Sequence, residues 1–191
     1  DYNDALEYIE KSLVKGMHNL KARTLKSALL RKLGKNTEAT EFAKETLNID
    51  ALDHSAYYEL YKLTGNGLDE MQAVMRGDNH NYIELALSYM TAYLTEDAIE
   101  ILKLAPNDNE PMVHYYLYAL TNDKSELDKA ENSESLYCFP NRLEDIAVRE
   151  EIPMDQVDVE DDKTVAYWAN ELAVDPVVGW LVCFNGYEKG K

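Results

Sequence analysis

Apolar and small side chains recur along most of this chain at intervals of three and four residues, the pattern of helices with one buried face. Gly16 and Gly34 follow two of these stretches, and glycine often ends a helix because it adopts backbone angles that other residues avoid. Asn36 or Thr37 can cap the next helix through a side-chain oxygen. The pattern predicts helices over 4–15, 20–33, 36–49, 54–64, 68–75, 79–94, 95–104, 111–120, 123–131, 141–150 and 163–173.

These helices form pairs that repeat every 34 residues. Ala5, Ala39 and Ala73 follow one another at this interval, and Ala22 is followed by Ala56. Small residues at fixed places let two helices cross closely, and stacked helix pairs bury a continuous core. The spacing therefore predicts an all-α fold built from repeated helix pairs.

The segment Leu20–Asp53 resembles a tetratricopeptide (TPR) repeat, with Gly34 at the turn and Ala39 at the helix crossing. Asp1–Asn19 resembles the second helix of a preceding repeat, so the chain is expected to begin in the middle of a repeat. Arg23 departs from the family, which usually has a bulky aromatic residue there. The resemblance implies a right-handed solenoid of antiparallel helix pairs over 1–152, followed by an irregular segment.

The segment 79–104 resembles the family most closely. Tyr82, Leu85, Ala86, Tyr89 and Ala98 fall where the family has large, leucine, small, tyrosine and alanine residues.

A second resemblance covers the run from Ala92 through HYYLYAL to FPNRLED. It is similar to bacterial proteins in which a galactose-mutarotase-like β-sandwich precedes a long TPR array. This resemblance implies a carbohydrate-related domain upstream, although no catalytic motif of such a domain lies in these residues.

The pattern changes over the last segment, 153–191. The run MDQVDVEDD is acidic and breaks the helical spacing, which is typical of a linker or solvated loop. It lacks the central glycine and closing glutamate of a helix–loop–helix calcium site. The apolar tail 177–191 is expected either to cap the last helix pair or to form an exposed patch that makes a homodimer.

The net charge of −17 is unevenly distributed. Positions 1–50 hold nine basic and eight acidic residues, whereas the other positions hold ten basic and 28 acidic residues. Such a surface repels phosphate, so nucleic acid is not expected as a partner. No apolar run reaches membrane-spanning length, and the two cysteines, Cys138 and Cys183, leave the compartment open.

No residue pattern predicts an enzyme, a metal site or a cofactor. The four histidines are scattered, and the chain has no Gly-x-Ser-x-Gly elbow and no phosphate-binding glycine loop. His114 falls on a face that can pack, so we expect a hydrogen-bonded core histidine there.

In a TPR-like solenoid the first helices of successive pairs line a concave groove. Basic and aromatic residues would provide charge-assisted hydrogen bonds and apolar area for an extended peptide carrying carboxylates. Alternatively, these residues form an ordinary solvated helix face. Thr24, Ala28 and Tyr58 occupy places of the family's carboxylate clamp, so chaperone tails are not expected. The predicted groove residues are Lys21, Thr24, Arg31, Lys32, Tyr58, Lys62, His80, Ile83 and Tyr115.

Three hypotheses follow. The leading one is a non-catalytic TPR-like scaffold that binds a protein or peptide partner. The second is an accessory domain of a larger carbohydrate-active bacterial protein. The third, an independent hydrolase, has no supporting motif in the sequence.

Overall fold

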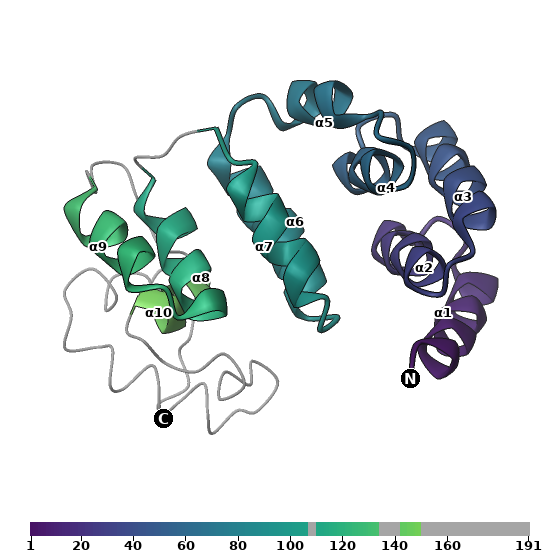
Figure 1. The fold of residues 1–191 in the computed structure, drawn as a ribbon. Helices are drawn as coiled ribbons and strands as arrows, with labels where there is room; N and C mark the ends of the chain where they lie inside the picture. The colour runs from purple at the N-terminus through teal and green to yellow at the C-terminus, as the bar shows by residue number, and fades with distance from the viewer. Residues whose placement is uncertain (107–109, 134–141, 150–191) are drawn as a thin grey trace, which may run out of the picture. The chain divides into compact units, whose positions relative to one another are not determined.

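The computed structural model describes residues 1–106, 110–133 and 142–149, and every regular element in these ranges is an α-helix. The all-α fold is therefore confirmed for them. The chain divides into two compact units, Asp1–Asp108 and Asn109–Lys191. The helices are α1 (Tyr2–Lys15), α2 (Leu20–Lys32), α3 (Asn36–Ile49), α4 (His54–Thr64), α5 (Leu68–Met75), α6 (Asn79–Met90), α7 (Thr95–Lys103), α8 (Pro111–Thr121), α9 (Lys124–Asn132) and α10 (Leu143–Arg149) (Figure 1).

Short turns join the helices of the first unit into the antiparallel pairs α2–α3, α4–α5 and α6–α7, with α1 packed on α2 (Figure 1). None of the helices within the described ranges is long and apolar enough to cross a membrane. The acidic run, the helix expected at 163–173, the apolar tail and the proposed boundary at 153 all lie outside the described residues.

One described helix ends more than one residue away from its predicted end. The sequence predicts a helix over 79–94, but α6 ends at Met90 and a turn follows. Tyr93 in this turn has a left-handed backbone, with φ 58°, and its side chain is 91 % exposed. Leu94, the residue directly before α7, is buried. An apolar stretch that continues through a turn cannot be told from a longer helix by spacing alone.

Some of the small residues that recur every 34 positions lie in the core of the first helix pairs, and others do not. Leu6, Leu29, Leu30 and Ala39 form one buried cluster, in which Ala39 lets α2 and α3 cross closely. Ala73, the third residue of the 34-residue series, is exposed. The short helix α5 instead buries Met71 and Met75, so its packing face is turned relative to the repeat.

Arg23, at a position where TPR repeats usually have an aromatic residue, stacks on an aromatic ring of α3. Its guanidinium carbon lies 4.2 Å from the ring centroid of Phe42, and Nε donates a hydrogen bond of 2.9 Å to Thr46 Oγ1. A guanidinium that stacks on a ring and meets an acceptor can be buried at low cost. Contacts with α3, the partner helix of the pair, thus hold the Arg23 side chain in place.

The second unit contains α8, α9 and α10. Pro111 begins α8, where its missing N–H leaves no bond unmade. His114 is buried and its Nδ1 lies 2.7 Å from Glu126 Oε2 of α9, which confirms the hydrogen-bonded core histidine. Tyr116 donates a hydrogen bond of 2.7 Å to Asp145 of α10. As expected from its few apolar residues, α9 is mostly exposed.

The turn between α4 and α5 depends on Gly67, and we expect Gly67→Ala to lower the free energy of unfolding by about 3 kcal/mol. Gly67 has φ +108°, and a Cβ there would lie 2.8 Å from the carbonyl oxygen of Tyr57. Gly65→Ala is the control, because Gly65 also has a positive φ but open space around it. It should cost roughly 1–2 kcal/mol in urea unfolding. Equal losses in the two variants would contradict the steric argument.

Candidate functional site

Four of the nine predicted groove residues belong to one charged cluster rather than to an open surface. Arg31 and Lys32 of α2 and Tyr58 and Lys62 of α4 all contact acidic groups of α7. The side of α2 and α4 that was expected to face a partner is therefore covered here by a helix of the same chain.

Arg31 is the centre of this cluster. Its Nε and Nη2 donate to the two carboxylate oxygens of Glu59 at 2.7 and 3.0 Å, and Nη2 also donates to Asp97 Oδ1 at 2.8 Å. Glu59 is fully buried and Asp97 is 2 % exposed. A buried carboxylate is very costly unless it is paired and hydrogen-bonded, so these two acids require Arg31.

Two lysines complete the ionic contacts. Lys32 Nζ lies 2.8 Å from Asp97 Oδ2, and Lys62 forms an ion pair with Glu100. The three basic side chains on α2 and α4 thus meet three carboxylates, two of which belong to α7. The cluster is balanced in formal charge.

Two tyrosines place their rings and hydroxyls in the same cluster. Tyr89 of α6 donates a 2.6 Å hydrogen bond to Glu59, and its ring meets that of Tyr58 edge-on at 5.4 Å. The Tyr58 hydroxyl lies 3.3 Å from Asp97 Oδ1. Burial and the adjacent carboxylates raise the pKa of both phenols, so they remain hydrogen-bond donors.

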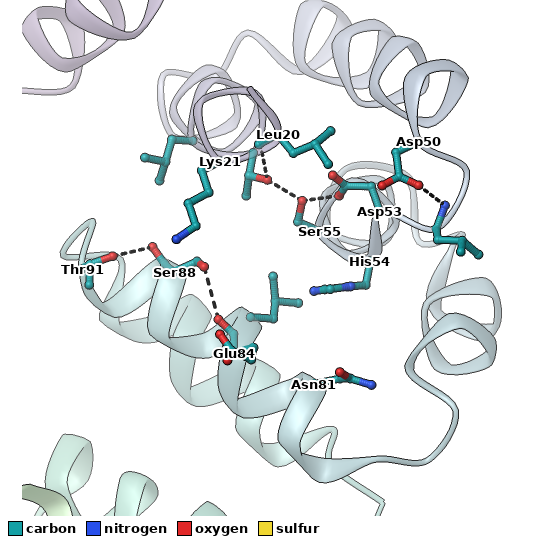
Figure 2. Close-up of a pocket in the computed structure, with 14 residues that line it drawn as sticks. Leu20, Lys21, Asp50, Asp53, His54, Ser55, Asn81, Glu84, Ser88 and Thr91 are labelled. Carbon is teal, nitrogen blue, oxygen red and sulfur yellow. Dashed lines mark hydrogen bonds between the residues drawn. The ribbon is translucent and has the colours of Figure 1, made fainter. Parts of the chain in front are cut away.

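A pocket of about 410 Å³ lies beside this cluster, and none of its lining residues belongs to α7 (Figure 2). It is enclosed by the beginning of α2, the turn before α4, the first residues of α4 and one face of α6. Its walls combine leucines with charged and hydroxyl side chains. The lining residues are Leu20, Lys21, Thr24, Leu25, Asp50, Leu52, Asp53, His54, Ser55, Asn81, Glu84, Leu85, Ser88 and Thr91.

One wall of the pocket is a chain of hydrogen-bonded side chains. Asp53 caps α4, its Oδ1 accepting from the backbone N–H of Ala56 at 2.8 Å. The same Oδ1 accepts from the Ser55 hydroxyl, which in turn contacts Thr24 Oγ1 of α2 (Figure 2). These hydrogen bonds join the first turns of α2 and α4, and the three side chains are buried.

His54 projects its ring into the pocket toward α6 (Figure 2). Burial lowers the pKa of His54 below its ordinary value, although Asp53, Asp50 and Glu84 act in the opposite direction. Because the ordinary value is already about 6.5, the imidazole is neutral at pH 7.

Of the predicted groove residues, Lys21 and Thr24 line the pocket. Ile83 is buried, His80 is exposed at the start of α6 near Glu84, and Tyr115 is half-buried in the second unit. Leu85 also matches the repeat pattern, but the sequence does not predict the remaining lining residues as part of a binding site. Asp53 alone carries a local signal, since aspartate before an apolar helix is a typical cap.

Within the part of the chain that the structure describes, no three histidine, cysteine, aspartate or glutamate side chains gather in a way that could hold a metal ion.

Removing the central guanidinium should destabilise the first unit strongly. We expect Arg31→Met to lower the free energy of unfolding by about 3–5 kcal/mol, because Glu59 and Asp97 remain buried without it. Lys32→Met should cost at most about 1 kcal/mol, since Lys32 is partly solvated. Adding Glu59→Gln to Arg31→Met should restore part of the loss. A similar small loss in both single variants, measured by urea unfolding, would contradict this role.

The cluster also predicts an acid-labile component of stability. Burial opposes ionisation of Asp97, but Lys32 and Arg31 outweigh it and hold the pKa of Asp97 below its ordinary value. Asp97 therefore stabilises the fold above about pH 4, and this contribution is lost as the pH falls through the folded pKa. The free energy of unfolding should fall less between about pH 7 and pH 3 in Asp97→Asn than in the wild type. Parallel pH profiles would show that Asp97 makes no such contribution.

No family model matches the chain, and no curated protein matches it. Among solved structures the chain is similar to one named "MamA RS-1 ArsTM double mutant", with 19 % sequence identity and a TM-score of 0.36 over 81 % of this chain and 86 % of that chain. A likeness at this level carries no argument about function. The helix pairs are compatible with TPR-like repeats, and the galactose-mutarotase resemblance stays a prediction.

Proposed function

We propose that this chain is a non-catalytic interaction or assembly scaffold of TPR-like helix pairs. It binds a segment of a partner protein in the pocket between α2, α4 and α6. The observation that carries the proposal is the pocket itself, which lies where the first helices of successive pairs face one another and is lined by groups that can contact a peptide.

The size of the pocket supports a peptide ligand. Its volume of about 410 Å³ falls within the range of roughly 300–1,000 Å³ common for ligand sites. A pocket of this size accommodates side chains of a partner segment.

The lining also supports this function. Leu20, Leu25 and Leu85 provide apolar area, while Lys21, Asn81 and Ser88 provide donors and acceptors around it. Binding sites typically combine apolar walls with a few placed polar groups in this way. The charged cluster holds α7, and through it the α6–α7 pair, against α2 and α4, so that the pocket keeps its shape.

A selection of short displayed peptides tests the proposal. Peptides selected on the whole chain should include some that lose at least about tenfold in affinity on Ser88→Trp, because the indole fills the pocket. Ser12→Trp is the matched control, since Ser12 is an exposed serine on α1 outside the pocket. Both variants are first checked for wild-type circular dichroism and thermal unfolding. A selection in which no peptide discriminates between the two variants would contradict the proposal.

A further inference from the structure

Three of the four basic residues predicted in the groove already form ion pairs within the chain. Arg31, Lys32 and Lys62 contact Glu59, Asp97 and Glu100 within the chain. An acidic partner segment would have to compete for these cations with Glu59 and Asp97, which are buried and costly to leave without a cation. The charge of the open pocket, rather than that of the predicted groove, therefore decides which segment binds.

The pocket has an excess of negative charge. Its ionised lining groups at pH 7 are the amine of Lys21 and the carboxylates of Asp50, Asp53 and Glu84. His54 adds no positive charge, because burial keeps the imidazole neutral at this pH. A cationic group entering the pocket meets attraction, and a carboxylate meets repulsion.

Asp53 provides a specific acceptor as well as charge. Its side chain lines the pocket although the residue is only 8 % exposed. Oδ1 accepts the hydrogen bonds of the α4 cap, whereas Oδ2 accepts none from the residues that the structure describes. A carboxylate oxygen has two acceptor sites, and a nearly buried one gains free energy from an incoming N–H donor.

The apolar part of the pocket suits the stem of a long basic side chain. Leu20, Leu25 and Leu85 lie beside the acidic groups, and Leu52 on the rim is 62 % exposed. Lysine and arginine place their methylene groups against apolar surface while the charged end meets an acceptor. A pocket with leucines beside carboxylates therefore complements a lysine or arginine side chain in both polarity and charge.

We infer that the pocket takes a lysine or arginine side chain of a partner protein segment, with its charged end at Asp53 and its methylene groups against the leucines, while Glu84 on the facing helix adds to the negative charge around it. This inference rests on the proposed function, because it names the anchor residue of the same pocket. It reverses the polarity expected from the sequence, which predicted a partner carrying carboxylates.

Amide-capped amino acids test the inference directly on the whole chain. Acetyl-arginine methylamide should shift the backbone NMR signals of Leu52 and Ser88, whereas the neutral isostere acetyl-citrulline methylamide and acetyl-glutamate methylamide should not. Asp53→Asn should weaken the arginine probe by about tenfold, since a charged hydrogen bond in a buried place is lost. Asparagine keeps the cap of α4, so the fold is preserved.

A control separates the pocket from the general acidity of the chain. Glu41 is exposed on α3 outside the pocket, so Glu41→Gln should leave probe binding unchanged, while Glu84→Gln should weaken it about two- to fivefold. Equal effects of Glu41→Gln and Glu84→Gln would overturn the inference as unspecific charge attraction.

The outcomes also separate the inference from the function on which it rests. If pocket-dependent peptides are selected but acetyl-glutamate methylamide binds and acetyl-arginine methylamide does not, the basic anchor is wrong and the peptide site stands. If no displayed peptide depends on the pocket, the proposed function fails, and the inference fails with it.

Discussion

Two buried carboxylates, Glu59 and Asp97, constrain the first unit more than any other feature. Burying either carboxylate without a cation is very costly, and Arg31 pairs with both, so α2, α4 and α7 meet at one point. The position of α7 follows from this meeting. Contact with α7 also explains why Tyr58 is fully buried, although the simple repeat predicts it on the outward side of α4.

The same contacts determine which charges remain available at the surface. By bringing Asp97 and Glu100 to Arg31, Lys32 and Lys62, α7 neutralises these three cations. The pocket then has one cation, Lys21, against the carboxylates of Asp50, Asp53 and Glu84. The polarity of the open site is thus a consequence of internal packing. The number of basic residues on the first helices of the pairs therefore does not predict the charge of the open pocket.

Features with local causes are predictable from the sequence, and long-range pairings are not. The caps and turns that bound the helices act within a few residues, so the helix starts were predicted to within two residues. Arg31 looks like a solvated groove residue because its partners are 28 and 66 positions away. Ala73 shows the converse: its spacing is right, but the eight-residue α5 packs through Met71 and Met75 instead.

Asp53 and Asn19 occupy the same place in successive repeats, 34 residues apart, and both cap a first helix. Asn19 Oδ1 accepts from the N–H of Ala22 at 3.1 Å, just as Asp53 Oδ1 accepts from that of Ala56 at 2.8 Å. A cap needs an oxygen acceptor and not a charge, and asparagine serves as well as aspartate. The helix dipole favours the charged form by only about 0.3–1 kcal/mol, while burying a carboxylate acts against it. Capping therefore does not account for a nearly buried negative charge at position 53, whereas a cationic group entering the pocket does.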